Sequence, residues 1–126
     1  MAVRSGTAGE DYACGMIEAR GGQILCRNYT ARGGEIDIVA REGRYLVFAE
    51  VKLRAAASLV SPLESVTPAK QRRLIRTAVQ FMMAHPSELQ PRFDVVALTT
   101  DGCTGEIIRA EYIENAFDGG GSYAAF

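Results

Sequence analysis

The sequence predicts an α/β domain in which helices flank a mixed central sheet. Three observations indicate this. Apolar residues recur at helical spacing in two segments, five other segments resemble strands, and a length of 126 residues suits one domain with its own core. The expected order is helix, three strands, helix, two strands. We expect one domain over residues 1–126, with its core in residues 8–117 and a flexible tail over residues 118–126.

The two predicted helices are bounded by recognisable start and stop signals. In residues 7–20, apolar side chains recur every three or four positions, and Gly21 ends the pattern. Thr67 is suited to cap the start of the longer helix, and Pro68 suits its first position. A second apolar stripe runs along this helix until His85, which precedes a proline. Both helices therefore have one face for a core.

Three predicted strands follow the first helix along the chain and two follow the second. They are Gln23–Tyr29, Glu35–Arg41, Tyr45–Leu53, Arg92–Thr99 and Glu106–Ile113. In the second strand, alternation predicts that Ile36, Ile38 and Ala40 share one face. Residues 55–66 have little pattern and are expected to form a mobile loop.

Composition excludes several classes of function. The net charge is −1, so a strongly basic nucleic-acid binder is excluded, although a local basic patch is not. No apolar run approaches the ~20 residues of a membrane span, and the N-terminus lacks the apolar region of a signal peptide. The three cysteines fit no zinc spacing, which indicates reduced thiols in a cytoplasmic protein. The single histidine argues against catalysis by a histidine dyad or triad.

Two acids and a lysine stand inside the second and third apolar strands. If the hairpin between them turns at residues 43–44, positions whose numbers sum to 87 lie opposite each other. Asp37 then faces Glu50, and Glu35 faces Lys52. Directly opposed residues have Cβ atoms about 4.5–5.5 Å apart, a distance at which two carboxylates repel unless a proton or a cation lies between them.

This juxtaposition suggests a metal site. Mg²⁺ or Mn²⁺ suits the oxygens of Asp37, Glu50 and the Val51 carbonyl, because Mg²⁺ takes oxygen ligands and keeps several waters. A metal there would polarise a phosphate and lower the pKa of a bound water. Lys52 would orient the attacking water or stabilise the developing negative charge. The predicted chemistry is hydrolysis of a phosphodiester bond.

Further candidates come from the two helices and from the end of the third strand. Glu10 lies at the end of the apolar stripe of the first helix, where it is either a further metal ligand or only the acid of a capping box with Thr7. Between Lys52 and Arg76 there are six basic residues and one acid. The candidate nucleic-acid contacts are Lys70, Gln71, Arg73, Arg76 and Arg54. The basic residues among them form either a phosphate-binding surface or an ordinary solvated face.

Structural interpretations compete with the catalytic ones. Lys52 and Glu35 can be a simple cross-strand ion pair without a catalytic role. Asp94 is expected to be a structural partner of Arg92 or of a loop amide rather than a site residue.

Six short segments together carry a resemblance to a known family. They are Gly9-Glu10, Arg27-Asn28, the segment 33–37, the segment 48–52, the segment 67–71 and the segment 92–96. Over roughly residues 8–117 they resemble the YraN family of small bacterial proteins. That resemblance implies a restriction-endonuclease-like fold and a similarity to archaeal Holliday junction resolvases.

The resemblance also implies roles by position. Glu10 matches a helix acid, Asp37 a metal-binding aspartate, Glu50 a second metal ligand and Lys52 a catalytic lysine. Ile36 stands where a proline often precedes the aspartate in the superfamily.

Three functional hypotheses follow. The first is a Mg²⁺- or Mn²⁺-dependent endonuclease that hydrolyses DNA, with branched or damaged DNA as the expected substrate. The second is a non-catalytic nucleic-acid-binding module of the same fold. The third is a cytosolic interaction protein whose sheet acids are merely paired. Whether the protein is a homodimer is left open.

Overall fold

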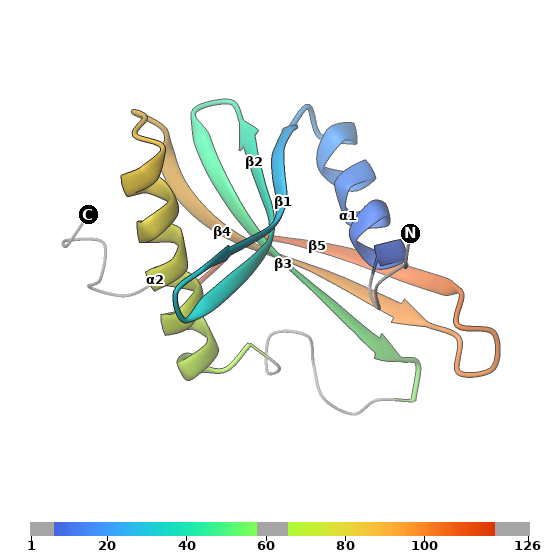
Figure 1. The fold of residues 1–126 in the computed structure, drawn as a ribbon. Coiled ribbons are helices and arrows are strands. Elements are labelled where there is room, and N and C mark those ends of the chain that lie inside the picture. Colours follow the sequence, from blue (N-terminus) through green and yellow to red (C-terminus); the bar gives the residue numbers. More distant parts are fainter. Residues whose placement is uncertain (1–6, 58–65, 118–126) are drawn as a thin grey trace, which may run out of the picture.

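The computed structural model describes residues 7–57 and 66–117, in which two helices cover a five-stranded sheet (Figure 1). The elements are α1 (Thr7–Ala19), β1 (Gln23–Ala31), β2 (Gly34–Glu42), β3 (Tyr45–Ala55), α2 (Pro68–Ala84), β4 (Gln90–Thr100) and β5 (Ile107–Phe117). Their order is the predicted one. Most of the expected mobile loop and all of the expected tail lie outside the described residues.

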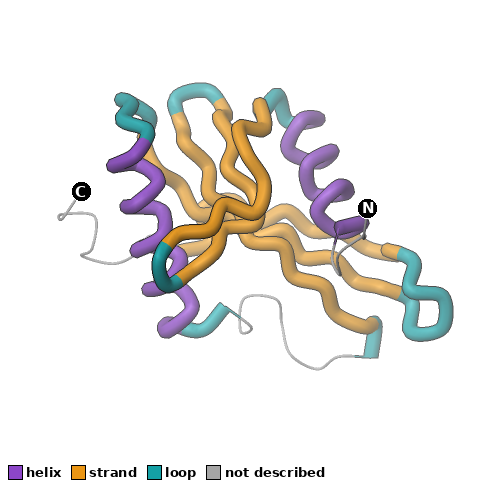
Figure 2. Tube along the Cα trace, viewed as in Figure 1, coloured by secondary structure: helices purple, strands orange, loops and turns teal. Residues whose placement is uncertain are grey.

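The sheet is mixed, as predicted, with strand order β1-β2-β3-β4-β5. Only β3 and β4 are parallel, and every other neighbouring pair is antiparallel. Parallel neighbours need a long crossover, which α2 supplies between them (Figure 2). Neither helix of the described residues is long and apolar enough to cross a membrane.

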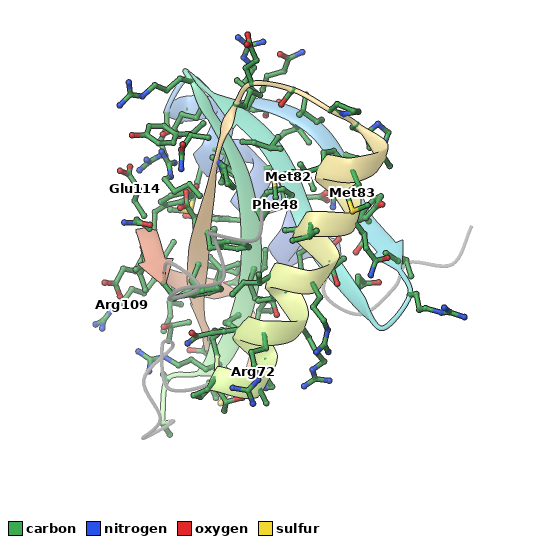
Figure 3. All side chains as sticks on the ribbon, turned by 90° about the vertical axis from the view of Figure 1, so that its left-hand side faces the viewer. Phe48, Arg72, Met82, Met83, Arg109 and Glu114 are labelled. Atoms are coloured by element: carbon green, nitrogen blue, oxygen red, sulfur yellow. The ribbon has the colours of Figure 1, made fainter. Side chains whose placement is uncertain are left out.

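Two buried clusters form the core, one on each face of the sheet. On one face, α1 packs Ala13 and Ile17 against Ile38 and Val47. On the other face, the apolar stripe of α2 packs against Phe48 and its neighbours, and Figure 3 shows Phe48 between the sheet and this helix. The start of α2 is the predicted one, because the Thr67 hydroxyl accepts a hydrogen bond from the Lys70 backbone N–H at 3.3 Å.

The predicted register between β2 and β3 is confirmed at their turn but ends early. Glu42 pairs with Tyr45 and Ile38 with Ala49, and Gly43 has the positive φ of +60° that a two-residue hairpin turn requires. Beyond Ile38 and Ala49 the ladder stops, because β2 continues with β1 whereas β3 continues with β4. We call this point of separation the fork.

The fork overturns one sequence-based prediction. Glu35 and Lys52 are not partners, because the ladder that would pair them ends before it reaches them. Lys52 instead forms an ion pair with Glu50 on its own strand.

Strict alternation on β2 also fails at the fork. Ile36 belongs to the cluster under α2, whereas Ile38 belongs to the cluster under α1, so the two do not share a face as predicted. Across from Asp37, Asn28 of β1 has a positive φ of +54° and is skipped in the β1–β2 pairing. Arg27 still pairs with Ile38 and Tyr29 with Ile36, so no residue is inserted here, and the change of face falls between these two pairs.

The β1–β2 turn is held against α2. A Cβ added to Gly34 would stand 2.2 Å from the Thr77 hydroxyl oxygen, so only glycine allows this close approach. The Gln80 side-chain amide donates a hydrogen bond to the Arg32 carbonyl at 3.1 Å. These contacts keep β2 bent towards α2 and away from β3.

A buried ionic network lies near the start of β4. Asp94 accepts two hydrogen bonds from Arg92 at 2.9 and 3.0 Å, one from the Tyr112 hydroxyl at 2.5 Å and one from the Asn115 backbone N–H at 2.9 Å. Burial, and then the hydrogen bond to Asp94, raises the pKa of Tyr112. The prediction that Asp94 is a structural partner of Arg92 is confirmed.

Candidate active site

Asp37, Glu50 and Lys52 meet at the fork, on the two strands that separate there. The Asp37 carboxylate accepts a hydrogen bond from the Val51 backbone N–H at 2.8 Å, which holds it across the gap against β3. Lys52 Nζ lies 3.2 Å from Glu50 Oε2. Between β2 and β3 the ladder has ended at this point, although Glu50 and Lys52 still pair with β4, and the three side chains line a common pocket.

Asp37 is electrostatically unusual. Burial raises its pKa to about 7, and the charge of Glu50 and a hydrogen bond between the two carboxyl groups act in the same direction. The Val51 N–H acts against this shift, because it favours the ionised form. The two acids therefore repel each other, and a proton or a cation between them would relieve this repulsion.

Substituting Asp37 by asparagine is expected to stabilise the metal-free protein at alkaline pH. A raised pKa means that the folded state holds its proton more tightly than the unfolded state, so stability falls as pH rises from about 4 to 7. The neutral amide of an asparagine carries no such cost. The expected gain in unfolding free energy is on the order of 2–4 kcal/mol at pH 8 and little at pH 4.

Denaturant unfolding of wild type and Asp37→Asn in chelator, at both pH values, measures this effect. Asp101→Asn is the matched control, because backbone N–H groups of Thr104 and Cys103 lower the pKa of Asp101. Its substitution should give no gain at pH 8. An Asp37→Asn gain that is the same at both pH values would contradict the assigned pKa.

A pocket of about 260 Å³ surrounds the fork. Its strand-borne lining includes Asp37, Glu50 and Lys52, and α2 contributes Lys70 and Arg73 to the opposite wall. Three predicted catalytic residues and two predicted nucleic-acid contacts therefore share one pocket. The exposed Glu35 also lines it, beside the glycines of the β1–β2 turn.

The other predicted nucleic-acid contacts lie outside this lining. Arg76 is exposed on α2, one helical turn after Arg73. The Gln71 side chain donates a hydrogen bond to the Val66 carbonyl at 3.0 Å, so it anchors the chain that enters α2. Arg54 is half-buried on β3, two residues after Lys52 and thus on the same side of the strand.

Glu10 is near the fork but is occupied by other partners. Its carboxylate accepts a hydrogen bond from Asn28 at 3.1 Å and pairs with Arg27 at 3.4 Å. The negative charge of Glu10 helps to raise the pKa of Asp37, so the two carboxylates are close enough to interact electrostatically. Within residues 7–57 and 66–117, however, no three acidic, histidine or cysteine side chains are grouped to hold a metal. The Thr7 side chain of the alternative capping box lies outside the described residues.

The donor set still fits a hard divalent cation. Asp37 and Glu50 supply carboxylate oxygens. Burial and then the charge of Glu50 raise the pKa of Asp37, and a cation relieves the repulsion between the two acids as a proton does. With two carboxylates, most of the coordination would come from water, the Val51 carbonyl and a substrate phosphate. Such a site would bind metal weakly without substrate.

Sequence reasoning placed Asn28 only in a segment of the family resemblance, without a role, and it missed the role of the β1–β2 turn. Asparagine tolerates positive φ better than most residues, but an asparagine inside a strand segment does not signal the change of face on the neighbouring strand. The paired glycines at 33 and 34 were recognisable as a turn. Their packing against Thr77 was not recognisable, because α2 is distant in the sequence.

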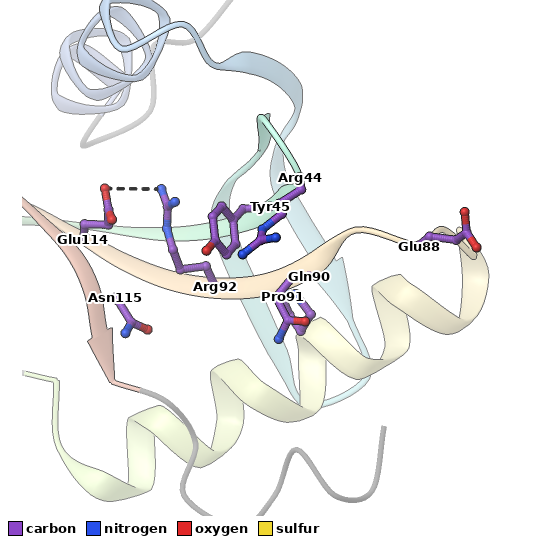
Figure 4. A pocket seen from close by; sticks show the side chains of 8 residues that line it. All are labelled: Arg44, Tyr45, Glu88, Gln90, Pro91, Arg92, Glu114 and Asn115. Carbon is purple, nitrogen blue, oxygen red and sulfur yellow. Dashed lines mark ion pairs between the residues drawn. The ribbon is translucent and has the colours of Figure 1, made fainter.

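A larger pocket of about 610 Å³ lies at the start of β3 (Figure 4). Its lining includes Tyr45, over which the Arg92 guanidinium stands at 4.8 Å, and Glu114, which pairs with Arg92 at 4.0 Å. The Arg92 guanidinium also donates hydrogen bonds to Asp94 and Glu42. Because the buried guanidinium of this pocket is already held by acids, we place the candidate active site at the smaller pocket.

The fold and the fork define an α/β protein with a carboxylate–lysine site at the separation of two strands. Residues 9–98 match the uncharacterised protein family UPF0102, and the chain belongs to this family. The resemblance to YraN proteins is therefore confirmed at the level of the family.

Relatives of this family match over most of their length. The UPF0102 protein Cphamn1_0017 of Chlorobium phaeobacteroides (strain BS1) is 46% identical over 116 residues, which cover 89% of this chain and 92% of that protein. The UPF0102 protein STH1475 of Symbiobacterium thermophilum is 45% identical over 118 residues, covering 93% and 98%. The UPF0102 protein RSc3265 of Ralstonia nicotianae is 44% identical over 121 residues, covering 92% and 88%.

Proposed function

We propose that this protein is a Mg²⁺- or Mn²⁺-dependent endonuclease that hydrolyses DNA phosphodiester bonds, and that its fold is restriction-endonuclease-like. The five-stranded mixed sheet with flanking helices is compatible with that fold. One observation carries the proposal. The Asp37 and Glu50 carboxylates and the Lys52 ammonium meet in a pocket whose opposite wall is cationic.

The residues divide the chemistry among them. Asp37 and Glu50 would hold the divalent ion, which when bound would polarise the phosphate and lower the pKa of a water. Lys52, held beside Glu50, orients the attacking water or stabilises charge that develops on the phosphate oxygens. Lys70 and Arg73 face the same pocket and attract the phosphodiester backbone.

Metal binding tests the proposal before any substrate is known. Wild type should bind Mn²⁺ weakly, with affinity rising about tenfold per pH unit below the Asp37 pKa of about 7, because the ligand must lose its proton. Asp37→Asn should lose this binding. Isothermal calorimetry and paramagnetic broadening of nearby resonances measure it.

Asp101→Asn is the control for this experiment, because Asp101 lies in the surface turn before β5. It should bind Mn²⁺ like wild type. Equal binding by wild type and Asp37→Asn would refute the metal site.

A non-catalytic nucleic-acid-binding module is the second candidate. The position of Glu10 favours it, because Asn28 and Arg27 hold this acid and leave two carboxylates at the fork. This candidate retains DNA binding without metal-dependent cleavage.

A further inference from the structure

The positive charges of α2 are concentrated in its first half. Its first half contains Lys70, Arg72, Arg73 and Arg76, its first turn has no acid, and no acid follows later in the helix. Of these, Lys70 lies in the first turn, where a cation opposes the helix dipole, and cations three or four residues apart on a helix repel one another. Within the described residues, Arg73 and Arg76 make no ion pair that would offset this repulsion. An anionic ligand on this surface would relieve the unfavourable charge.

The β1–β2 turn adds one more positive charge, that of Arg32, to the same surface. The hydrogen bond from Gln80 to the Arg32 carbonyl and the packing of Gly34 on Thr77 fix this turn beside α2. Arg32 is exposed there. We call Arg32, Lys70, Arg73 and Arg76 the α2 wall. Lys70 and Arg73 line the pocket of the fork, and Arg32 and Arg76 lie beside it, on the turn and one helical turn after Arg73. Arg72 is on the same helix outside the pocket lining, and Figure 3 shows it near the start of α2, so it serves as the comparison for Arg73.

The other side of the fork has the opposite electrostatic character. There the start of α1 presents Glu10 and Asp11, and both carboxylates share the single guanidinium of Arg27, at 3.4 and 2.7 Å. Two negative charges on one positive charge leave this side net negative. Since α1 and α2 cover opposite faces of the sheet, the fork lies between a cationic wall and an acidic one.

We propose that the site takes one nucleic-acid strand, in a single-stranded or locally unpaired segment, with its phosphates along the α2 wall. This inference rests on the proposed function and names its substrate class. A duplex presents two phosphate backbones and is the more densely charged ligand, so a duplex site needs cations on both sides. Here the second backbone would meet Glu10 and Asp11. A pocket of about 260 Å³ also suits one phosphodiester group.

Binding in chelator, without cleavage, tests this proposal. Fluorescent oligonucleotides of equal length, one single-stranded and one duplex, are titrated with wild type at several salt concentrations. The single strand should bind about tenfold more tightly, and the logarithm of its affinity should fall with the logarithm of salt at a slope of about −3, as four phosphate contacts predict.

Matched variants locate the strand. Arg32→Ala and Arg73→Ala should each reduce the slope by about 0.7 and weaken binding, and Arg32→Lys should restore it. The controls are Arg44→Ala, at the other hairpin turn, and Arg72→Ala, on the same helix. Both controls should weaken binding less than Arg32→Ala and Arg73→Ala do. The melting temperatures of all variants should stay near that of wild type, because these side chains are exposed.

The outcomes separate this inference from the proposed function. Duplex binding as tight as single-strand binding would overturn the one-strand inference and leave the nuclease proposal standing. Equal losses in Arg72→Ala and Arg73→Ala, or in Arg44→Ala and Arg32→Ala, would overturn the α2 wall. Failure of wild type to bind any nucleic acid would overturn both proposals.

Discussion

Replacing Lys52 by alanine is expected to reduce cleavage by about a hundredfold or more, while metal and DNA binding remain. The Lys52 ammonium lies 3.2 Å from Glu50 at the pocket of the fork, so its charge is available to the attacking water or to the phosphate. An interaction made only in the transition state changes the rate and leaves ground-state binding largely unaltered.

The assay uses linear, flapped and four-way DNA with Mg²⁺ or Mn²⁺, on wild type, Lys52→Ala and Glu50→Gln. If Lys52 is only the ion-pair partner of Glu50, its loss should cost about 0.2–1 kcal/mol of stability and leave activity intact. Equal cleavage by all three proteins would indicate a contaminating nuclease or a site elsewhere. Retained DNA binding with no cleavage by any of them would favour the binding module.

Replacing Asp94 by alanine is expected to cost about 3–5 kcal/mol of unfolding free energy, the largest stability effect that we predict. Only 1% of Asp94 and 5% of Arg92 are exposed, so the arginine would keep a buried charge with Glu42 as its remaining close partner. The hydroxyl of Tyr112 and the backbone N–H of Asn115 would lose their acceptor as well.

Urea unfolding at constant pH measures this cost as a lower midpoint with an unchanged slope. Asp94→Asn is the informative intermediate, since it removes the charge and keeps an acceptor oxygen for Asn115. Glu111→Ala, at an exposed position of the neighbouring strand β5, should change stability by no more than about 0.5 kcal/mol. If Asp94→Ala unfolds like this control, the network does not stabilise the fold.

Local signals predicted the elements well. The Thr67 cap and Pro68 start α2, and Gly43 turns the hairpin in the predicted register, because each depends on a few consecutive residues. Strand ends were predicted less well. β5 reaches Phe117, beyond the predicted Ile113, because Phe117 stacks on Phe93 of the neighbouring strand with ring centroids 5.1 Å apart.

The sequence by itself determined that this protein is an α/β chain and that Asp37 and Glu50 come together. That followed from one short hairpin, whose turn sets the register of both strands. Only the tertiary structure decided that the ladder opens beside these acids, that Lys52 pairs with Glu50 rather than Glu35, and that Glu10 is held by Asn28. These features depend on contacts between segments distant in the sequence, above all the packing of the β1–β2 turn on α2. Packing in the folded protein decides which surfaces meet in this way, and the local periodicity of the sequence does not predict it.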